Sequence, residues 1–344
     1  MFNPFLAGTR KGIYKKIEAV EDPELKMRAM NLPTLLKHRW ADSTNRKYEQ
    51  AWKKWSAWCD TYPESNPRPA DAFYISLYLN DLVLQGCKIG ALDAATSGIR
   101  WGHISLGFTK PLENDLVKTT LEGAKRTIGK GKGKNQKEPF TTEMAKKVVA
   151  QFGGSKNLLH QRLVVICLLA FSGFLRISEL FEIKICDITF LEDHMEINIP
   201  KAKNDQQRQG HIVYISRTWS PYCPVEWTKT YIERADIGKE PTSYLVSRLC
   251  RTKLGHKALG NHNLSDTTIR DIFRRDVAPI CQEIEPGAYS LHSFRSGGAS
   301  AAVNNGVDER LIGKHGRWKS GYSRDRYFKD SKSRRLSVTK ALGL

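Results

Sequence analysis

A stretch of alternating glycine and lysine divides the chain and limits what each side of it can become. Residues 129–140 read GKGKGKNQKEPF, with Pro139 close to the end. Such a stretch has almost no apolar side chain to bury, so it predicts a basic linker. A chain of 344 residues is long enough for about two domains. We place a basic arm at 1–30, one domain at 31–128 and a second at 141–344.

The charge of the chain restricts its partners. The formal net charge is +19 and the sequence pI is about 9.6. A surplus of this size predicts a polyanionic partner, and double-stranded DNA is favoured over a membrane surface. No apolar run is long enough to cross a bilayer, and the first residues lack an apolar segment of signal-peptide length, so an intracellular protein is expected. The seven cysteines are scattered without a CxxC pair, which predicts neither a zinc site nor a disulfide framework.

The first domain is predicted to be a helical bundle. Four segments have helical periodicity or helix-ending signals, with Ser43 as the expected cap of the first: 43–62, 70–86, 92–106 and 113–128. The first segment carries an apolar stripe of Tyr48, Trp52, Trp55 and Cys59. Aromatic stripes can stack on bases, but at helical spacing they more often form a core, and we predict a core here.

The second domain is predicted to combine helices with a small antiparallel sheet. Helical patterns at 141–152 and 158–171 precede about three alternating strands, and further helices follow to the end of the chain. The predicted fold class is therefore mainly α with a small antiparallel β-sheet: an N-terminal helical bundle and an α+β domain. Basic residues in the linker and in a polar hairpin tip are expected to contact the DNA backbone, although both segments could also be merely solvated. They are Lys130, Lys132, Lys134, Lys201 and Arg208.

Residues suited to phosphate chemistry gather near the end of the chain, at His292, Arg295, Trp318 and Tyr327. Cleaving a phosphodiester without a metal needs cations on its oxygens, a nucleophile and an acid for the leaving oxygen. Arginine suits the oxygens because its planar fork makes two parallel hydrogen bonds. Tyrosine can attack and later leave as a phenolate, because its pKa of about 10 is far below that of a sugar hydroxyl.

A second arginine is expected to come from a distant segment. Arg176 follows the apolar helix predicted at 158–171, and Glu179 lies three residues later on the same helical face. A guanidinium beside a buried helix needs an anionic partner or solvent. Glu179 is therefore expected to orient Arg176.

The chain resembles the tyrosine recombinases, or phage-type integrases, through four blocks in the order typical of that family. GFLRISEL at 173–180 looks like the first arginine box, and Lys203 stands in the place of the catalytic lysine. His292 and Arg295 match a His-x-x-Arg box. Trp318 and Tyr327 match the final pair, which is separated by nine residues.

The resemblance implies a role for each matching residue. Arg176 and Arg295 would hold the scissile phosphate, supported by Glu179. Lys203 would protonate the leaving 5′-oxygen, and His292 would assist proton transfer. Trp318 would pack and hydrogen-bond at the phosphate, while Tyr327 would form a 3′-phosphotyrosine. The implied enzyme is a site-specific recombinase that needs no metal or other cofactor and no small-molecule substrate, and that works as a homotetramer on DNA.

Several alternatives remain open at this point. Tyr322 competes with Tyr327 as nucleophile and Lys201 with Lys203 as acid. His315 could be a second active-site imidazole, but it stands twelve residues before Tyr327, so an exposed histidine at a helix end is expected. A type IB topoisomerase would use similar chemistry, and a recombinase descendant could bind DNA without cleaving it. The segments HSFRSGGAS and GRWKS resemble recombinases of eukaryotic mobile elements, which would imply a nuclear location.

Overall fold

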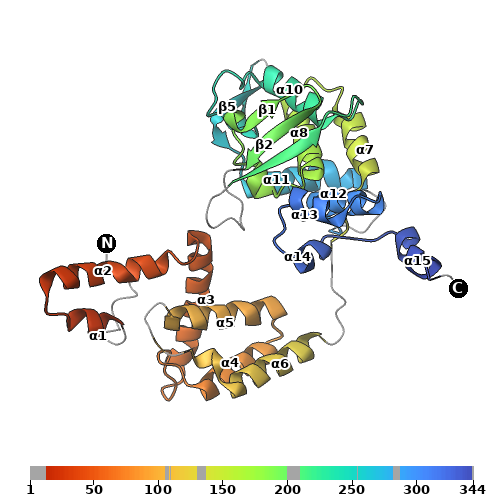
Figure 1. The fold of residues 1–344 in the computed structure, drawn as a ribbon. Coiled ribbons are helices and arrows are strands. Elements are labelled where there is room, and N and C mark those ends of the chain that lie inside the picture. The colour runs from red at the N-terminus through yellow and green to blue at the C-terminus, as the bar shows by residue number, and fades with distance from the viewer. Residues whose placement is uncertain are drawn as a thin grey trace. The chain divides into compact units, whose positions relative to one another are not determined.

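A computed structural model describes residues 13–104, 108, 110–129, 137–199, 210–253, 255–281 and 287–342. The chain forms two compact units, Met1–Asn135 and Gln136–Leu344 (Figure 1). The predicted fold class is confirmed, since the described residues are mainly helical with small antiparallel sheets. None of the helices in these ranges is long and apolar enough to cross a membrane.

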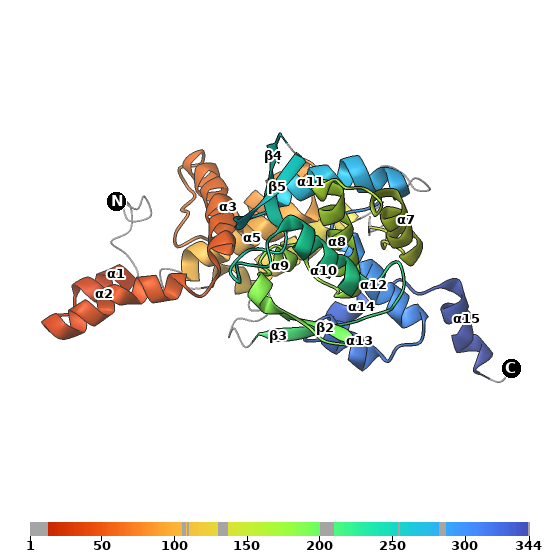
Figure 2. The same ribbon diagram turned by 90° about the horizontal axis from the view of Figure 1, so that it is seen from above.

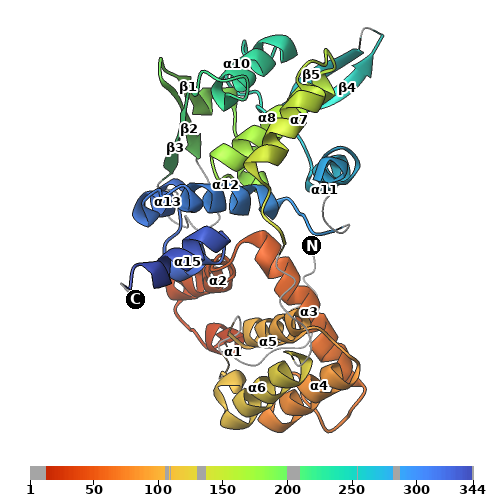
Figure 3. The same ribbon diagram turned by 90° about the vertical axis from the view of Figure 1, so that its right-hand side faces the viewer.

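The first unit is a helical bundle in which α3 packs on α5 and α4 packs on α6 (Figures 1 and 3). Its helices are α1 (Ile13–Glu18), α2 (Pro23–Lys37), α3 (Asp42–Asp60), α4 (Ala72–Leu84), α5 (Ile89–Ile104) and α6 (Asp115–Gly129). The predicted core stripe is confirmed on α3, where Trp55 is fully buried and Trp52 and Cys59 are nearly so. Because apolar area removed from water stabilises a fold, these aromatic rings hold the bundle together.

The start of this unit differs from the prediction, which placed no helix before residue 43. The Asp22 side chain accepts a hydrogen bond from the Leu25 amide at 2.7 Å, and Pro23 occupies the first turn, so α2 has a good N-terminus. Its apolar residues, such as Met30, are exposed and follow no single-face pattern, which is why periodicity missed the helix. Ala41, rather than the predicted Ser43, is the N-cap of α3.

The second unit surrounds the buried helix α8 and contains two sheets. Its helices are α7 (Thr142–Phe152), α8 (Leu158–Ser172), α9 (Ile177–Leu180), α10 (Pro224–Ala235), α11 (Asp266–Ile272), α12 (His292–Asn304), α13 (Glu309–His315), α14 (Gly321–Asp325) and α15 (Lys332–Lys340). Its strands are β1 (Ile188–Phe190), β2 (His194–Ile199), β3 (His211–Ser216), β4 (Ser247–Thr252) and β5 (Gly255–Asn263).

The predicted three-stranded sheet is present, with antiparallel order β1-β2-β3. Ile197 on the central strand pairs with Ile188 and Val213, and it faces the core. A second antiparallel pair, β4–β5, was not predicted, because its strands are short of apolar residues and mostly half-exposed. Figure 3 shows this hairpin at one end of α8.

Two glycines allow α12 to approach its neighbours closely. A Cβ at Gly297 would collide with the Phe140 carbonyl, and a Cβ at Gly298 would collide with the Phe171 carbonyl. Phe140 falls within the predicted linker, yet it is fully buried, and its amide donates to the Ser293 carbonyl at 2.9 Å. Because α12 is held this tightly against α8 and Phe140, the side chains that α12 presents are rigidly placed. α13 packs on α12, and Figure 2 shows the two helices side by side.

Candidate active site

The turn between α8 and α9 presents Arg176 and Glu179. Arg176 is the N-cap residue of α9, and its amide donates to Glu179 Oε2 at 2.9 Å. The Arg176 guanidinium reaches Glu179 Oε1 at 2.5 Å. The Arg176 side chain is 13% exposed and that of Glu179 is 2% exposed, so this pair lies at the edge of the core. Arg176 thus finds the anionic partner that the sequence predicted.

Arg295 reaches the same place from α12. It is 1% exposed, and its two terminal nitrogens donate to the carbonyl oxygens of Phe174 and Gly316. Its guanidinium also lies 4.0 Å from Glu179 Oε2. The two predicted phosphate-binding arginines, which are far apart in sequence, therefore meet around one carboxylate.

A third arginine, Arg317, belongs to this cluster and was not predicted. Its side chain is 2% exposed, and Nη2 donates to Glu179 Oε2 at 2.7 Å. The three guanidinium groups and Glu179 carry a surplus of two positive charges. The sequence signal was weak, since Arg317 stands next to Trp318 in a basic segment where a solvated side chain is the ordinary expectation.

The charges in the cluster perturb one another. Burial alone raises the pKa of Glu179, but the charge of Arg317 and the hydrogen bond and charge of Arg176 outweigh it, and the pKa is lowered. Burial, followed by the positive charges of Arg176 and Arg317, lowers the pKa of Arg295. An anion bound here would relieve the repulsion among the arginines, so the cluster is suited to a phosphate group.

Trp318 and Tyr327 lie against Arg295. The Arg295 guanidinium carbon is 4.4 Å from the Trp318 ring centroid and 5.3 Å from that of Tyr327, and the two rings are 5.1 Å apart. Both rings pack on a small apolar cluster that includes Phe174 and Ala299. The Trp318 Nε1 is buried without an acceptor among the described residues, so it is a donor that an oxygen ligand could satisfy.

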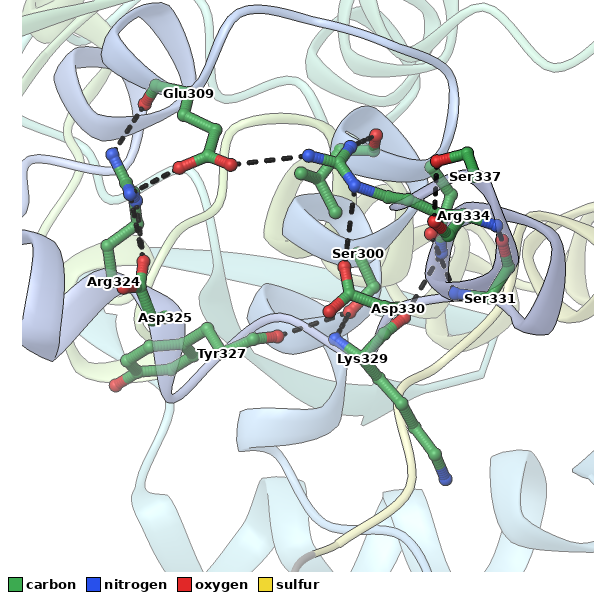
Figure 4. A network of polar contacts seen from close by, with 12 residues as sticks. Ser300, Glu309, Arg324, Asp325, Tyr327, Lys329, Asp330, Ser331, Arg334 and Ser337 are labelled. Atoms are coloured by element: carbon green, nitrogen blue, oxygen red, sulfur yellow. Dashed lines mark hydrogen bonds and ion pairs between the residues drawn. The ribbon is translucent and has the colours of Figure 1, made fainter. Parts of the chain in front are cut away.

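The backbone around Tyr327 is fastened to α12. The hydroxyls of Ser296 and Ser300 both donate to the Tyr327 carbonyl oxygen, at 2.9 and 3.1 Å. The Ser300 hydroxyl in turn accepts from the Lys329 amide at 2.9 Å, and the Asn304 amide group donates to the Lys329 carbonyl at 3.1 Å. Figure 4 shows the link between Ser300 and the segment that carries Tyr327.

Glu309, at the start of α13, ties the two sides of the Tyr327 segment together (Figure 4). It accepts from Arg324 at 2.5 Å and from Arg334 at 3.2 Å. Arg324 lies three residues before Tyr327, and Arg334 belongs to α15. The Glu309 side chain is 47% exposed, so these ion pairs contribute little stability, but they restrict how the segment moves.

The structure describes only some of the remaining candidate residues. His292 is the exposed first residue of α12, one turn before Arg295. Tyr322 is 79% exposed on α14. The cationic candidates of the linker and the hairpin tip lie outside the described residues: Lys130, Lys132, Lys134, Lys201, Lys203 and Arg208.

The prediction that His315 is exposed was wrong. Its Nε2 donates to the Ser172 carbonyl oxygen at 2.8 Å, and its ring meets Phe174 edge-on, with centroids 4.6 Å apart. Burial lowers the pKa of His315, so the neutral ring is favoured. His315 therefore helps join α13 to the end of α8, close to the turn that carries Arg176.

The comparisons with known proteins identify the class of this chain. The model of the phage integrase family matches residues 116–334. The chain belongs to the phage integrase family, and the prediction of a tyrosine recombinase is confirmed.

A curated relative is similar in sequence, and solved structures are similar in fold. The chain is 27% identical over 308 residues to an integrase/recombinase xerD homolog of Selenomonas ruminantium, with 86% of each chain covered. The Tn1549 transposon integrase in complex with transposon right-end DNA has a similar fold, with a TM-score of 0.55, 11% identity, and 91% and 99% of the two chains covered. XerH recombinase bound to a palindromic difH substrate has a TM-score of 0.53 at 14% identity, with coverage of 80% and 73%.

Proposed function

We propose that this site-specific tyrosine recombinase cleaves DNA by attack of Tyr327 on a phosphodiester held by Arg176 and Arg295. The observation that carries the proposal is the surplus of positive charge around Glu179, directly beside the Tyr327 ring. A buried excess of guanidinium groups is costly unless an anion completes it. A DNA phosphate is the anion that fits both the family and the charge of the chain.

The proposed reaction is a reversible transesterification. The Tyr327 oxygen bonds to phosphorus while the bond from phosphorus to the 5′-oxygen breaks, which leaves a 3′-phosphotyrosine. His292 accepts the phenolic proton, and Lys203 donates a proton to the departing 5′-oxygen. A 5′-hydroxyl from a second duplex then attacks the phosphotyrosine and releases Tyr327. The covalent link conserves the energy of the broken bond, so this scheme requires neither ATP nor a metal.

The two arginines and Trp318 have complementary roles in this scheme. The arginines stabilise the charge that develops on the non-bridging oxygens, and their positions are fixed in advance by Glu179 and by backbone carbonyls. Trp318 packs against both Arg295 and Tyr327, and its Nε1–H, which has no acceptor among the described residues, is offered to a phosphate oxygen. Preorganisation of this kind lowers the barrier because little rearrangement is needed when the charge appears.

The assembly and its partners are part of the proposal. Exchange of strands between two duplexes needs four cleavages, so we propose a homotetramer on double-stranded DNA, inside the cell. XerH and the Tn1549 integrase were solved with DNA, which supports the DNA part of this proposal. The domain at 31–128, the linker lysines and the hairpin-tip cations Lys201 and Arg208 would contact the backbone.

The finer assignment to eukaryotic mobile elements, and with it a nuclear location, has no support in the comparisons. The relatives reported above are a Selenomonas ruminantium protein, a transposon integrase and XerH. The assignment to eukaryotic mobile elements rests on the amino-acid sequences of two short segments, and recombination for a mobile element remains a prediction.

A nicked suicide substrate tests the reaction. The short 5′ fragment diffuses away after cleavage, so the covalent adduct accumulates and is counted on a denaturing gel. The wild-type chain should form the adduct, Tyr327→Phe should form none while still binding DNA, and Tyr322→Phe should behave as wild type. An adduct formed by Tyr327→Phe would overturn the assignment of the nucleophile.

A further inference from the structure

We propose that Arg317 is a positioning residue, which holds the Glu179 carboxylate and the turn at Gly173 so that Arg176 points at the phosphate. This inference rests on the proposed function. The terminal nitrogens of Arg317 donate to Glu179 and to three backbone carbonyls, so the role that we assign to it runs through these neighbours.

The contacts of Arg317 converge on the turn that carries Arg176. Its Nη2 donates to Glu179 Oε2 at 2.7 Å and to the Phe174 carbonyl at 3.2 Å. Its Nη1 lies 3.4 Å from the Gly173 carbonyl. A planar fork that bridges a carboxylate and two successive carbonyls fixes their relative positions, which a single point charge would not do.

The two carboxylate oxygens of Glu179 accept hydrogen bonds from different donors. Oε1 accepts from the Arg176 guanidinium at 2.5 Å, while Oε2 accepts from Arg317 and from the Arg176 amide at 2.9 Å. Arg317 therefore fixes one oxygen and leaves the other directed at the Arg176 side chain. Without Arg317, the carboxylate can turn towards Arg295, which already lies 4.0 Å from Oε2.

The backbone of Arg317 adds an independent observation. Its φ is +58°, in the left-handed region that glycine adopts freely and other residues avoid. An arginine is held there because its side chain is bound at several acceptors, including the His315 carbonyl at 3.1 Å. The preceding residue, Gly316, accepts from Arg295 through its carbonyl. The turn that Arg317 occupies thus braces both phosphate-binding arginines.

The lowered pKa of Glu179 is consistent with a positioning role for Arg317. After burial, which raises the pKa of Glu179, the charge of Arg317 is the largest single influence that lowers it, followed by the backbone hydrogen bond, the charge and the side-chain hydrogen bond of Arg176. Among the described residues, Arg295, His315 and Tyr327 also interact electrostatically with members of this cluster. Loss of Arg317 is therefore expected to raise the pKa of Glu179, so that the carboxylate gains a proton at a higher pH.

A double-mutant cycle tests the proposal through the first-order rate of adduct formation on the suicide substrate. Arg317→Gln should slow the wild-type rate by up to about a hundredfold, as expected when a remote change misplaces a reacting group. In the Glu179→Gln background the same substitution should slow the rate by less than about threefold, because the two residues act as one unit. The pKa of Glu179, measured by NMR of its carboxyl carbon, should be higher in Arg317→Gln than in wild type.

Arg162 provides a matched control. It is also a buried arginine, 3% exposed, and its Nη1 donates to the Ser247 carbonyl at 2.7 Å, away from Glu179. Arg162→Gln should destabilise the unit without changing the pKa of Glu179, and its effect should combine additively with Glu179→Gln.

The outcomes separate this inference from the proposed function. A wild-type rate in Arg317→Gln, or full additivity with Glu179→Gln, would overturn the role of Arg317 while the recombinase chemistry stands. Absence of any adduct from the wild-type chain would overturn the proposed function instead. If Arg317→Gln does not fold, the cycle is run with Arg317→Lys, which keeps the charge but not the fork. That variant should form the adduct at least about fivefold more slowly than wild type while the pKa of Glu179 is unchanged, and a wild-type rate would refute the role.

Discussion

Replacing Glu179 with glutamine should destabilise the second unit, because the arginines around it would lose their common counter-charge. The carboxylate lies 2.5 Å from Arg176, 2.7 Å from Arg317 and 4.0 Å from Arg295. Glutamine has nearly the same shape, so the change removes a charge without creating a cavity. The variant would leave three neighbouring guanidinium groups with no negative charge among them.

The expected loss is about 3 kcal/mol in the free energy of unfolding at neutral pH. Removing one partner of a buried ion pair typically costs about 3–5 kcal/mol. We expect the low end of that range because the Arg176 side chain is 13% exposed and can be partly solvated.

Acidification should reduce the difference in the free energy of unfolding between wild type and Glu179→Gln. The pKa of Glu179 is lower in the folded chain than the ordinary value of about 4.3. The stability that Glu179 contributes is therefore fully present above that ordinary value and is lost as pH falls through the folded pKa. The wild type should lose more stability than Glu179→Gln as the pH is lowered below about 4.3.

Amide hydrogen exchange of α8, measured by mass spectrometry in increasing urea, reports the stability of this unit separately from the other. Sulfate, which resembles a phosphodiester in its charged oxygens, should stabilise Glu179→Gln more than wild type. A variant within about 0.5 kcal/mol of wild type at neutral pH, or one unaffected by sulfate, would refute this account of the charge cluster.

Four further outcomes are expected. Arg295→Lys should slow adduct formation by about 10²–10³-fold while DNA binding persists in a gel-shift assay. Gly298→Ala should lower the free energy of unfolding by about 1–3 kcal/mol in a urea titration, because its Cβ would strike the Phe171 carbonyl. His315, whose pKa is lowered by burial, should lose its stabilising contribution as pH falls below about 6.5, and an ordinary pKa by NMR would contradict this. DNA affinity should fall about 10³-fold between roughly 50 and 200 mM salt, and a flat plot against salt would count against a basic interface.

The predicted arginine pair could be found from the sequence because its signals are local. Arg176 follows a long apolar run and precedes Glu179 by three residues, so an ion pair was expected, and the structure contains it. Arg295 was recognised from its place in a His-x-x-Arg box, and its guanidinium does reach Glu179. Patterns that recur within a helix turn are the ones that sequence reasoning handles best.

Arg317 was not predicted, and His315 was wrongly predicted to be exposed, because the groups that contact these side chains come from distant segments of the chain. His315 donates to the Ser172 carbonyl, while Arg317 donates to the Gly173 carbonyl and to Glu179, and no pattern in the sequence near residue 315 predicts these contacts. The hairpin β4–β5 and helix α2 were missed because they lack the usual patterns. Apolar and polar residues do not alternate regularly along the two strands, and α2 has no single apolar face.

The most direct test of the central claim is to trap the protein on a suicide substrate, digest the adduct and identify the DNA-linked peptide by mass spectrometry. Our account predicts that the 3′-phosphate is carried by Tyr327. A link at Tyr322 or at any other residue would contradict the proposal that Arg295, Trp318 and Tyr327 close around one phosphate.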